Sequence, residues 1–194
     1  MDKRAWRQAL KAERAALPED QRNRMDDDIC HVVLSIPTFQ RAKTVFAYLS
    51  VGDEVDTRAL IRECWADDKR VAIPRCVSTA KQGKPLMEWY EITSFEGLET
   101  SGFGVEEPVQ EPELRVFPQD DPNAVAIVPG FAFDAEGFRI GYGGGFYDVF
   151  LGEFAGTSIG LCRSPFFDTR EIPKDAHDIP VNMVATDNFA VIVS

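Results

Sequence analysis

The segment at residues 139–148, RIGYGGGFYD, holds four glycines within five positions: Gly141, Gly143, Gly144 and Gly145. Glycine lets a phosphate approach the main chain closely, and N–H groups that precede a helix can converge on an anion. The segment does not match G-x-G-x-x-G, because Phe146 takes the third glycine position, and no Lys-Ser or Lys-Thr follows as in the Walker motif. It indicates a phosphate-binding loop of another kind, and the alternative is a flexible glycine turn.

Asp148 follows this loop by three residues. Mg²⁺ prefers one or two protein carboxylates together with phosphate oxygens and water, so an acid near the start of such a helix is a candidate metal ligand. The alternative for Asp148 is a partner of the helix dipole, which is common and weak.

A basic stripe runs along the expected first helix, where Lys3, Arg7, Lys11 and Arg14 recur at steps of three and four residues. Asp2 can cap this helix, and Trp6, Leu10 and Leu17 lie near another face. Lys3 and Arg7 are one turn apart and therefore share a face. The stripe is a candidate phosphate contact, and the alternative is a solvated basic face.

The remaining pattern alternates short apolar runs with helical segments, which predicts an α/β fold with an open, mostly parallel sheet and helices on both faces. Residues 1–194 are expected to form a single domain. Helices are expected at 18–36, 56–65 and 146–154, and strands at 44–50, 70–75, 86–92, 124–130, 157–162 and 189–194. The strand at 124–130 is continuously apolar, which predicts burial on both faces. The proline-rich stretch at 92–124 is either a functional flap or poorly ordered.

Composition excludes several classes of partner. The net charge of −11 and the pI near 4.7 argue against a broad nucleic-acid or anionic-membrane surface. Cys30, Cys64, Cys76 and Cys162 have no metal-binding spacing, which predicts buried reduced thiols in a cytoplasmic protein. No signal-peptide pattern and no apolar run of membrane-spanning length is found.

The segment PGFAFDAEGFRIGYGGGFYD at 129–148 resembles the signature of the 5-formyltetrahydrofolate cyclo-ligase family, also called 5,10-methenyltetrahydrofolate synthetase. Further matches follow in the family's order: KRAWR near the start, YLSVGDEVDT at 48–57, AIPRC at 72–76, MEWYEI at 87–92, FGVEEP at 103–108 and DIPVNMVATD at 178–187. The resemblance therefore runs nearly from end to end. It implies a fold like that of the sugar-phosphate isomerase and CoA-transferase group.

The resemblance implies an ATP- and Mg²⁺-dependent ligase. The formyl oxygen of 5-formyltetrahydrofolate would attack the γ-phosphate to give an imidate phosphate, and N10 would then close the ring to 5,10-methenyltetrahydrofolate. ADP and phosphate would be released. Phosphoryl transfer relies on positioning and on neutralisation of charge, so donors, cations and a metal site are expected rather than a protein nucleophile.

The resemblance also implies residue roles. Catalytic roles fall to Lys3, Arg7, Tyr142 and Asp148. The nucleotide would contact Lys3, Arg4, Arg7, Arg139, Ile140, Gly141, Tyr142, Gly143, Gly144, Gly145, Phe146 and Tyr147. The folate would contact Leu49, Glu54, Phe103, Tyr142, Gly143, Gly144, Gly145 and Phe146. The metal ligands would be Asp148 and Asp178.

This sequence departs from the family pattern inside the glycine segment. Tyr142 and Gly144 stand where some relatives carry basic residues, Phe146 replaces a commoner tyrosine, and Phe103 stands where tryptophan is frequent. Phosphate neutralisation would then depend more on Lys3, Arg4, Arg7 and Mg²⁺. Met87 and Trp89 are further candidates for a wall against the folate rings, and Arg75 for an anion contact.

Two other functions remain open at this point. One is a non-catalytic folate or nucleotide sensor on the same scaffold, and the other is a sugar-phosphate isomerase-like enzyme, because fold alone does not fix function. His31 and His177 are isolated and carry no acid–base signal, while Asp134 is expected to stabilise the turn before the glycine segment. A monomer is expected.

Overall fold

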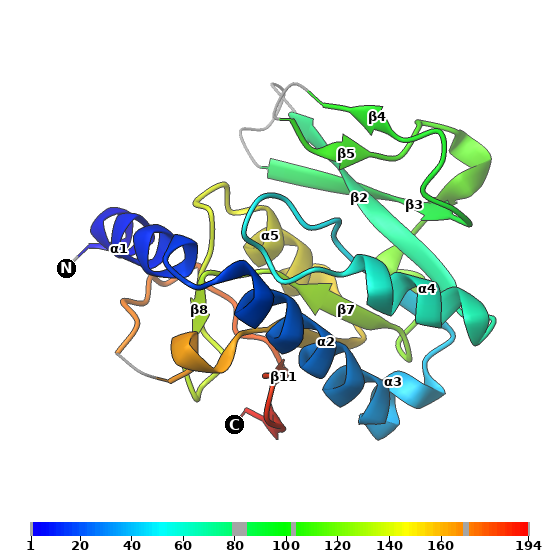
Figure 1. The fold of residues 1–194 in the computed structure, drawn as a ribbon. Helices are drawn as coiled ribbons and strands as arrows, with labels where there is room; N and C mark the ends of the chain where they lie inside the picture. The colour runs from blue at the N-terminus through cyan, green and yellow to red at the C-terminus, as the bar shows by residue number, and fades with distance from the viewer. Residues whose placement is uncertain (1, 79–84, 102–103, 169–170, 194) are drawn as a thin grey trace.

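A mixed eight-stranded sheet organises the computed structural model, which describes residues 2–78, 85–101, 104–168 and 171–193 (Figure 1). The strand order is β12-β11-β10-β7-β1-β2-β3-β6. The strands are β1 Thr44–Phe46, β2 Arg70–Ser78, β3 Pro85–Ile92, β6 Arg115–Val116, β7 Val125–Val128, β10 Thr157–Leu161, β11 Met183–Ala185 and β12 Ala190–Ile192.

The middle of the sheet is parallel and its margins are antiparallel. Strands β11, β10, β7, β1 and β2 pair in parallel, whereas β12, β3 and β6 are added antiparallel. All four residues of the central strand β7 are buried, as its continuous apolar run predicts. The predicted open, mostly parallel sheet is confirmed.

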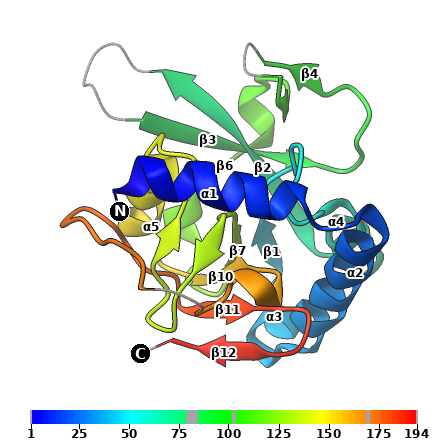
Figure 2. The same ribbon diagram turned by 60° about the vertical axis from the view of Figure 1, so that its left-hand side comes forward.

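Helices cover both faces of the sheet, as predicted (Figure 2). Helices α2 Glu19–Ser35, α3 Pro37–Arg41 and α4 Arg58–Ala66 pack on one face with Val45, Val71 and Ile127. Helices α1 Lys3–Ala15 and α5 Phe146–Glu153 pack on the other face with neighbours such as Phe46 and Ala126. Adjacent strand residues point to opposite faces, so each central strand contributes to both layers.

Helix α1 begins as the sequence predicts, because the Asp2 carboxylate accepts a hydrogen bond from the Ala5 N–H at 2.8 Å. The basic residues of this helix do not all lie on one solvated face. Arg14 is buried with Leu10 and Trp6, one and two turns before it, instead of lying on a solvated face with Lys11. Leu17 lies beyond the end of the helix and packs against the same cluster.

The stretch at 92–124 is built from short pieces in the part that the structure describes. It contains β4 Glu99–Thr100, β5 Glu106–Glu107, β6 and two 3-10 turns, Pro112–Leu114 and Pro118–Asp120. Strands β4 and β5 pair with each other and lie beside the long hairpin of β2 and β3 (Figure 1). A further two-stranded pair, β8 Ala132–Phe133 and β9 Arg139–Ile140, leads into the glycine segment.

Several sequence predictions need correction. Strand 44–50 is regular only over Thr44–Phe46, β3 is antiparallel to β2 because the two form a hairpin, and β11 was not predicted. Pro18 caps α2 rather than lying in its first turn. Three cysteines are buried, but Cys76 is exposed. Among the described residues, no helix combines the length and apolar character needed to span a membrane.

Candidate active site

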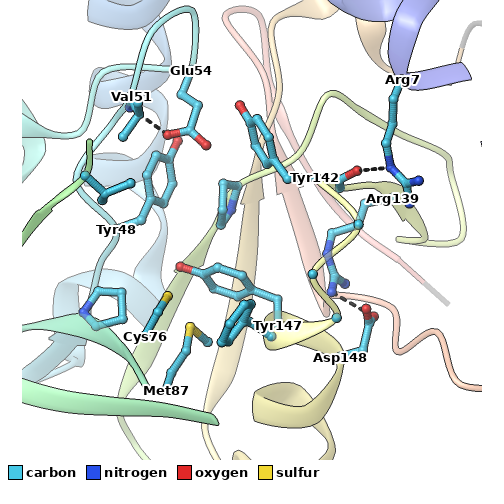
Figure 3. A pocket seen from close by; sticks show the side chains of 18 of the residues that line it. Arg7, Tyr48, Val51, Glu54, Cys76, Met87, Arg139, Tyr142, Tyr147 and Asp148 are labelled. Atoms are coloured by element: carbon cyan, nitrogen blue, oxygen red, sulfur yellow. Dashed lines mark hydrogen bonds and ion pairs between the residues drawn. The ribbon is translucent and has the colours of Figure 1, made fainter. Parts of the chain in front are cut away.

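A cavity of about 630 Å³ opens beyond the carboxyl ends of the parallel strands β1 and β7 (Figure 3). Open α/β sheets bind ligands at this edge, where loops after neighbouring strands diverge. The loop after β1, strands β2 and β3, the glycine segment and helix α1 all contribute to the wall. The lining residues include Lys3, Arg7, Leu49, Glu54, Cys76, Met87, Arg139, Gly141, Tyr142, Gly143, Gly144, Gly145, Phe146, Tyr147, Asp148, Asp175, His177 and Asp178.

The glycine segment forms the turn between β9 and α5, and two of its glycines need positive φ angles. Gly143 has φ +94°, and Gly145, the N-cap of α5, has φ +70°. A Cβ on Gly143 would lie 3.0 Å from the guanidinium carbon of Arg7. Glycine is thus needed at these positions for two reasons. It allows the left-handed backbone at Gly143 and Gly145, and at Gly143 it also leaves room for the Arg7 guanidinium from α1.

Cations from α1 reach the loop from the opposite end of the chain. The Nε–H of Arg7 donates to the carbonyl oxygen of Gly141 at 2.7 Å (Figure 3). Lys3 forms ion pairs with Asp178 and, at 2.8 Å, with Asp175. Burial acts to lower the pKa of Lys3, but its bonds to these two carboxylates outweigh burial and raise the pKa. Lys3 therefore carries its charge at the cavity wall.

An ion pair between Arg139 and Asp148 connects β9 to the first turn of α5 (Figure 3). The guanidinium donates to Asp148 Oδ1 at 2.8 Å and to the carbonyl oxygen of Ile179 at 2.7 Å. The same Oδ1 accepts the Ile179 N–H at 3.2 Å. Burial lowers the pKa of Arg139, although the charge of Asp148 opposes this shift.

Glu54 enters the cavity from the loop after β1 and faces Tyr142 of the glycine segment (Figure 3). Its carboxylate accepts the Val51 N–H at 2.7 Å. Burial raises the pKa of Glu54 above its ordinary value, and the Val51 N–H and the nearby Tyr142 hydroxyl reduce the shift. Tyr142 remains 52% exposed and packs on Phe131, with ring centroids 4.4 Å apart.

The wall between these polar groups is apolar. Leu49 and Met87 are 5% and 9% exposed, and Tyr147 lies beside Met87 with its hydroxyl directed into the cavity (Figure 3). The Tyr147 hydroxyl oxygen is buried and has no hydrogen-bond partner among the described residues. A buried, unpaired hydroxyl is costly, so a ligand that bonds to it would gain affinity.

The structure brings most of the predicted site residues to this cavity, but not all. Arg4 is on the exposed side of α1 and does not line the cavity, and the Ile140 side chain is buried in the core. Trp89 is likewise a core residue, packed edge-to-face on Phe46. Phe103 lies outside the described residues. Arg75 forms an ion pair with Glu99 at 2.8 Å, away from the cavity.

Other residues reach the cavity without having been predicted. Asp175 and His177 join Asp178, and one ligand atom from each lies within 4.8 Å of the others. Cys76 also lines the cavity; the residue as a whole is exposed, but partial burial of its thiol raises the thiol pKa. The segment DAHDIP carried this information as a cluster of three potential ligands around Asp178. Asp134 holds the preceding turn by accepting the N–H groups of Glu136 and Phe138, as predicted.

Fold and cavity together define an open-sheet α/β protein with a ligand site that combines a glycine loop, cations and carboxylates. Comparison with known proteins identifies the family within this class. The sequence model of the 5-formyltetrahydrofolate cyclo-ligase family matches residues 1–187. The chain is 30% identical to the 5-formyltetrahydrofolate cyclo-ligase of Escherichia coli K12, with 91% of this chain and 96% of that protein covered. The corresponding probable enzyme of Schizosaccharomyces pombe is also 30% identical, with 81% of each chain covered.

Solved structures agree with this assignment. The NMR structure of Aquifex aeolicus 5,10-methenyltetrahydrofolate synthetase has a TM-score of 0.80 and 30% sequence identity, with 100% of this chain and 93% of that chain covered. The Mycoplasma pneumoniae synthetase, at 19% identity and a TM-score of 0.73, supports the fold alone. The chain belongs to the 5-formyltetrahydrofolate cyclo-ligase family. It is therefore an enzyme, a ligase of folate one-carbon metabolism.

Proposed function

We propose that the chain converts 5-formyltetrahydrofolate to 5,10-methenyltetrahydrofolate with hydrolysis of ATP to ADP and phosphate. The observation that carries this proposal is a single cavity with two different ends. The glycine segment, Lys3 and Arg7 suit the phosphates of a nucleotide, while Glu54 and the apolar wall suit a flat, N–H-bearing pterin ring. Transfer of a phosphoryl group from the nucleotide to the formyl oxygen of the folate requires both ligands to lie next to each other in one cavity.

The proposed chemistry proceeds in two steps. The formyl oxygen attacks the γ-phosphorus of ATP, the bond to the bridging oxygen breaks, and ADP leaves as an imidate phosphate forms. N10 then attacks the activated carbon, loses its proton, and displaces inorganic phosphate as the ring closes. Neither step requires a covalent bond to the protein, so the side chains act by positioning and by stabilising charge.

The chain's own residues divide these tasks. Arg7 and Lys3 of α1 line the cavity together with the glycine segment and would bind phosphate oxygens, with main-chain N–H groups of Gly143, Gly144 and Gly145 as additional donors. Glu54 would accept hydrogen bonds from the pterin, and Tyr142 would fix the Glu54 carboxylate. Met87, Leu49 and Tyr147 would exclude water from the ring.

Carboxylates at the phosphate end fit a magnesium ion. Asp148 and Asp178 both line the cavity, and Asp178 lies beside Asp175 and His177. Both hydrogen bonds that Asp148 accepts from side chain and main chain in the described part of the protein use Oδ1, so its second oxygen is the atom we propose for the cation. Mg²⁺ would neutralise charge on the phosphate oxygens. In the present arrangement Lys3 and Arg139 balance these acids, which keeps the carboxylates in the cavity wall.

Turnover by the purified chain tests the proposal. The chain is incubated with 5-formyltetrahydrofolate and Mg-ATP, and the absorbance of the methenyl product is followed while ADP is measured in parallel. We expect one ADP for each methenyl group, and no product when ATP is omitted or replaced by a non-hydrolysable analogue. Product formation without a nucleotide, or folate binding without any turnover, would contradict the proposal.

A further inference from the structure

Two arginines outside the predicted site are almost completely buried. Arg14, near the end of α1, is 2% exposed, and Arg163, just after β10, is 3% exposed. Burying a guanidinium is costly unless its N–H groups are bonded and its charge is balanced. Both guanidinium groups bind the same loop, residues 51–57, which carries Glu54. The free-energy cost of burying them therefore points to a role for this loop.

Arg163 binds this loop together with an acid from α2. Its Nε and one terminal nitrogen donate to the two carboxylate oxygens of Asp26 at 2.7 and 2.8 Å. Its terminal nitrogens also donate to the carbonyl oxygens of Asp53, at 2.9 Å, and of Glu54, at 3.1 Å. Asp26 in turn accepts the Asp56 N–H at 3.0 Å. The Arg163–Asp26 ion pair thus binds three peptide groups of the loop: the carbonyl groups of Asp53 and Glu54 and the N–H of Asp56.

Arg14 connects the same loop to the glycine side of the cavity. It donates to the carbonyl oxygen of Asp53 and forms an ion pair with the Asp53 carboxylate at 3.2 Å. It also donates to the carbonyl oxygen of Gly130 at 2.9 Å, and its guanidinium carbon lies 5.3 Å from the centre of the Phe131 ring. The Phe131 ring also contacts the ring of Tyr142, which faces Glu54 (Figure 3).

We propose that Arg14 and Arg163 are positioning residues that fix the Glu54 carboxylate for the folate substrate. Residues 51–57 form neither helix nor strand, so these side-chain bonds stand in for the main-chain pairing that would otherwise order the loop. Neither arginine lines the cavity, so both act through the loop backbone. This inference deepens the proposed function and rests on it, because it assigns Glu54 to folate recognition.

A role in positioning differs from a role in stability alone. A merely structural arginine would lower thermal stability and reduce the affinity for nucleotide and folate alike, or affect neither. A positioning arginine acts on the ligand that Glu54 contacts and leaves the nucleotide end unaffected. Its effect also disappears when Glu54 itself has lost its charge, which a double-mutant cycle measures.

The experiment uses Arg163→Lys and the milder variant Asp26→Asn, which leaves Arg163 and its bonds to the loop carbonyls in place. Lysine keeps the charge but loses the planar set of donors. Binding of 5-formyltetrahydrofolate is measured by calorimetry without ATP, binding of Mg-ATP is measured separately, and thermal midpoints are recorded. Ile61→Val, a buried change in α4 away from the cavity, serves as the control for lost stability.

We expect folate affinity to fall about tenfold in Arg163→Lys and about threefold in Asp26→Asn, with Mg-ATP affinity within about twofold of the parent. In the Glu54→Gln background, Arg163→Lys is expected to add less than about threefold. Equal losses for folate and nucleotide, full additivity with Glu54→Gln, or no loss in either variant would overturn the inference. If the parent chain binds folate but shows no turnover, the proposed function is contradicted. The comparison of folate and Mg-ATP affinities among the variants still decides the role of Arg163 in that case.

Discussion

The two ends of the cavity are held in different ways. At the end proposed for the phosphates, Lys3 and Arg139 are paired with the carboxylates of Asp175, Asp178 and Asp148. At the other end, Glu54 accepts the Val51 N–H and faces Tyr142 (Figure 3), and its loop is bound by buried arginines. The first end has exchangeable ion pairs, whereas the second has a fixed acceptor.

This difference indicates how each ligand would be accommodated. Phosphate oxygens can replace carboxylates as partners of the cations, and the released carboxylates become available to a metal ion. A pterin would instead meet an acceptor whose geometry is set before binding, which would lower the entropic cost of association. Substitutions at the phosphate end should therefore change turnover and nucleotide affinity, and those at the Glu54 end should change folate affinity.

The largest expected effect is that of Asp148→Asn. Asparagine keeps an acceptor for Arg139 but loses the charge proposed to hold Mg²⁺, so turnover is expected to fall about 100- to 1,000-fold while folate affinity changes little. Steady-state turnover at saturating Mg²⁺ and calorimetric folate binding provide the two measurements. Asp67→Asn, at the exposed end of α4, is the matched control. Unchanged turnover would remove Asp148 from the phosphate end.

The second-largest effect is expected when Arg7, which packs over the glycine segment, is replaced. Arg7→Ala is expected to raise the KM for ATP about tenfold or more with little change in the KM for folate, because charge-assisted bonds to phosphate are lost. Lys11→Ala, one turn further along α1 and exposed, controls for helix propensity and net charge. Arg4→Ala is expected to resemble this control, because Arg4 lies outside the cavity. A larger effect at Arg4 than at Arg7 would reverse the assignment of the helix face.

At the other end, Glu54→Gln is expected to weaken folate binding about tenfold and leave the KM for ATP within about twofold. The same variant tests the raised pKa of Glu54. Because the folded chain holds this proton more tightly than the unfolded chain, the stability that Glu54 contributes is present below the ordinary carboxylate pKa and is lost as pH rises through the raised pKa.

Glu54→Gln does not titrate, so its thermal midpoint should improve relative to that of the parent between pH 4 and pH 7. Paired melting curves at the two pH values measure this change. A midpoint difference that is constant with pH would contradict the burial of the Glu54 carboxylate as the cause of its shift.

The smallest expected effect is that of Tyr142→Phe, which keeps the ring on Phe131 and removes the hydroxyl that faces Glu54 (Figure 3). A typical net hydrogen-bond contribution of about 1 kcal/mol predicts that folate affinity falls about three- to fivefold. Tyr142→Ala also removes the ring contact and should lose more. Equal folate affinity in Tyr142→Phe and the parent would show that the hydroxyl does not support Glu54.

Local patterns predicted the elements better than the connections between them. The Asp2 cap, the apolar run of β7 and the glycines before α5 each carry a local physical signal, and all three were read correctly. The antiparallel direction of β3 was missed because alternation and composition do not state how a strand is paired. Strand β11 was missed because Asn182 and Thr186 flank its three residues, whereas the equally short β1 and β12 lie within longer apolar runs.

The site residues show the same contrast between local patterns, which the sequence reveals, and tertiary contacts, which it does not. The glycine segment, Glu54 and the first-helix cations were found because each has a recognisable pattern or a family match. Arg14 was assigned to a basic stripe, although its spacing from Trp6 and Leu10 also placed it on the buried face. Arg163 and Asp26 are 137 positions apart, so their pairing depends on tertiary packing that no local pattern contains.

A crystal structure of the chain with ADP, Mg²⁺ and 5-formyltetrahydrofolate tests the central claim most directly. The account predicts phosphates against the main-chain amides at Gly143–145 with Arg7 and Lys3 beside them, and the pterin against Glu54 in the same cavity. A nucleotide bound elsewhere, with the glycine segment empty and α1 remote from the phosphates, would contradict it.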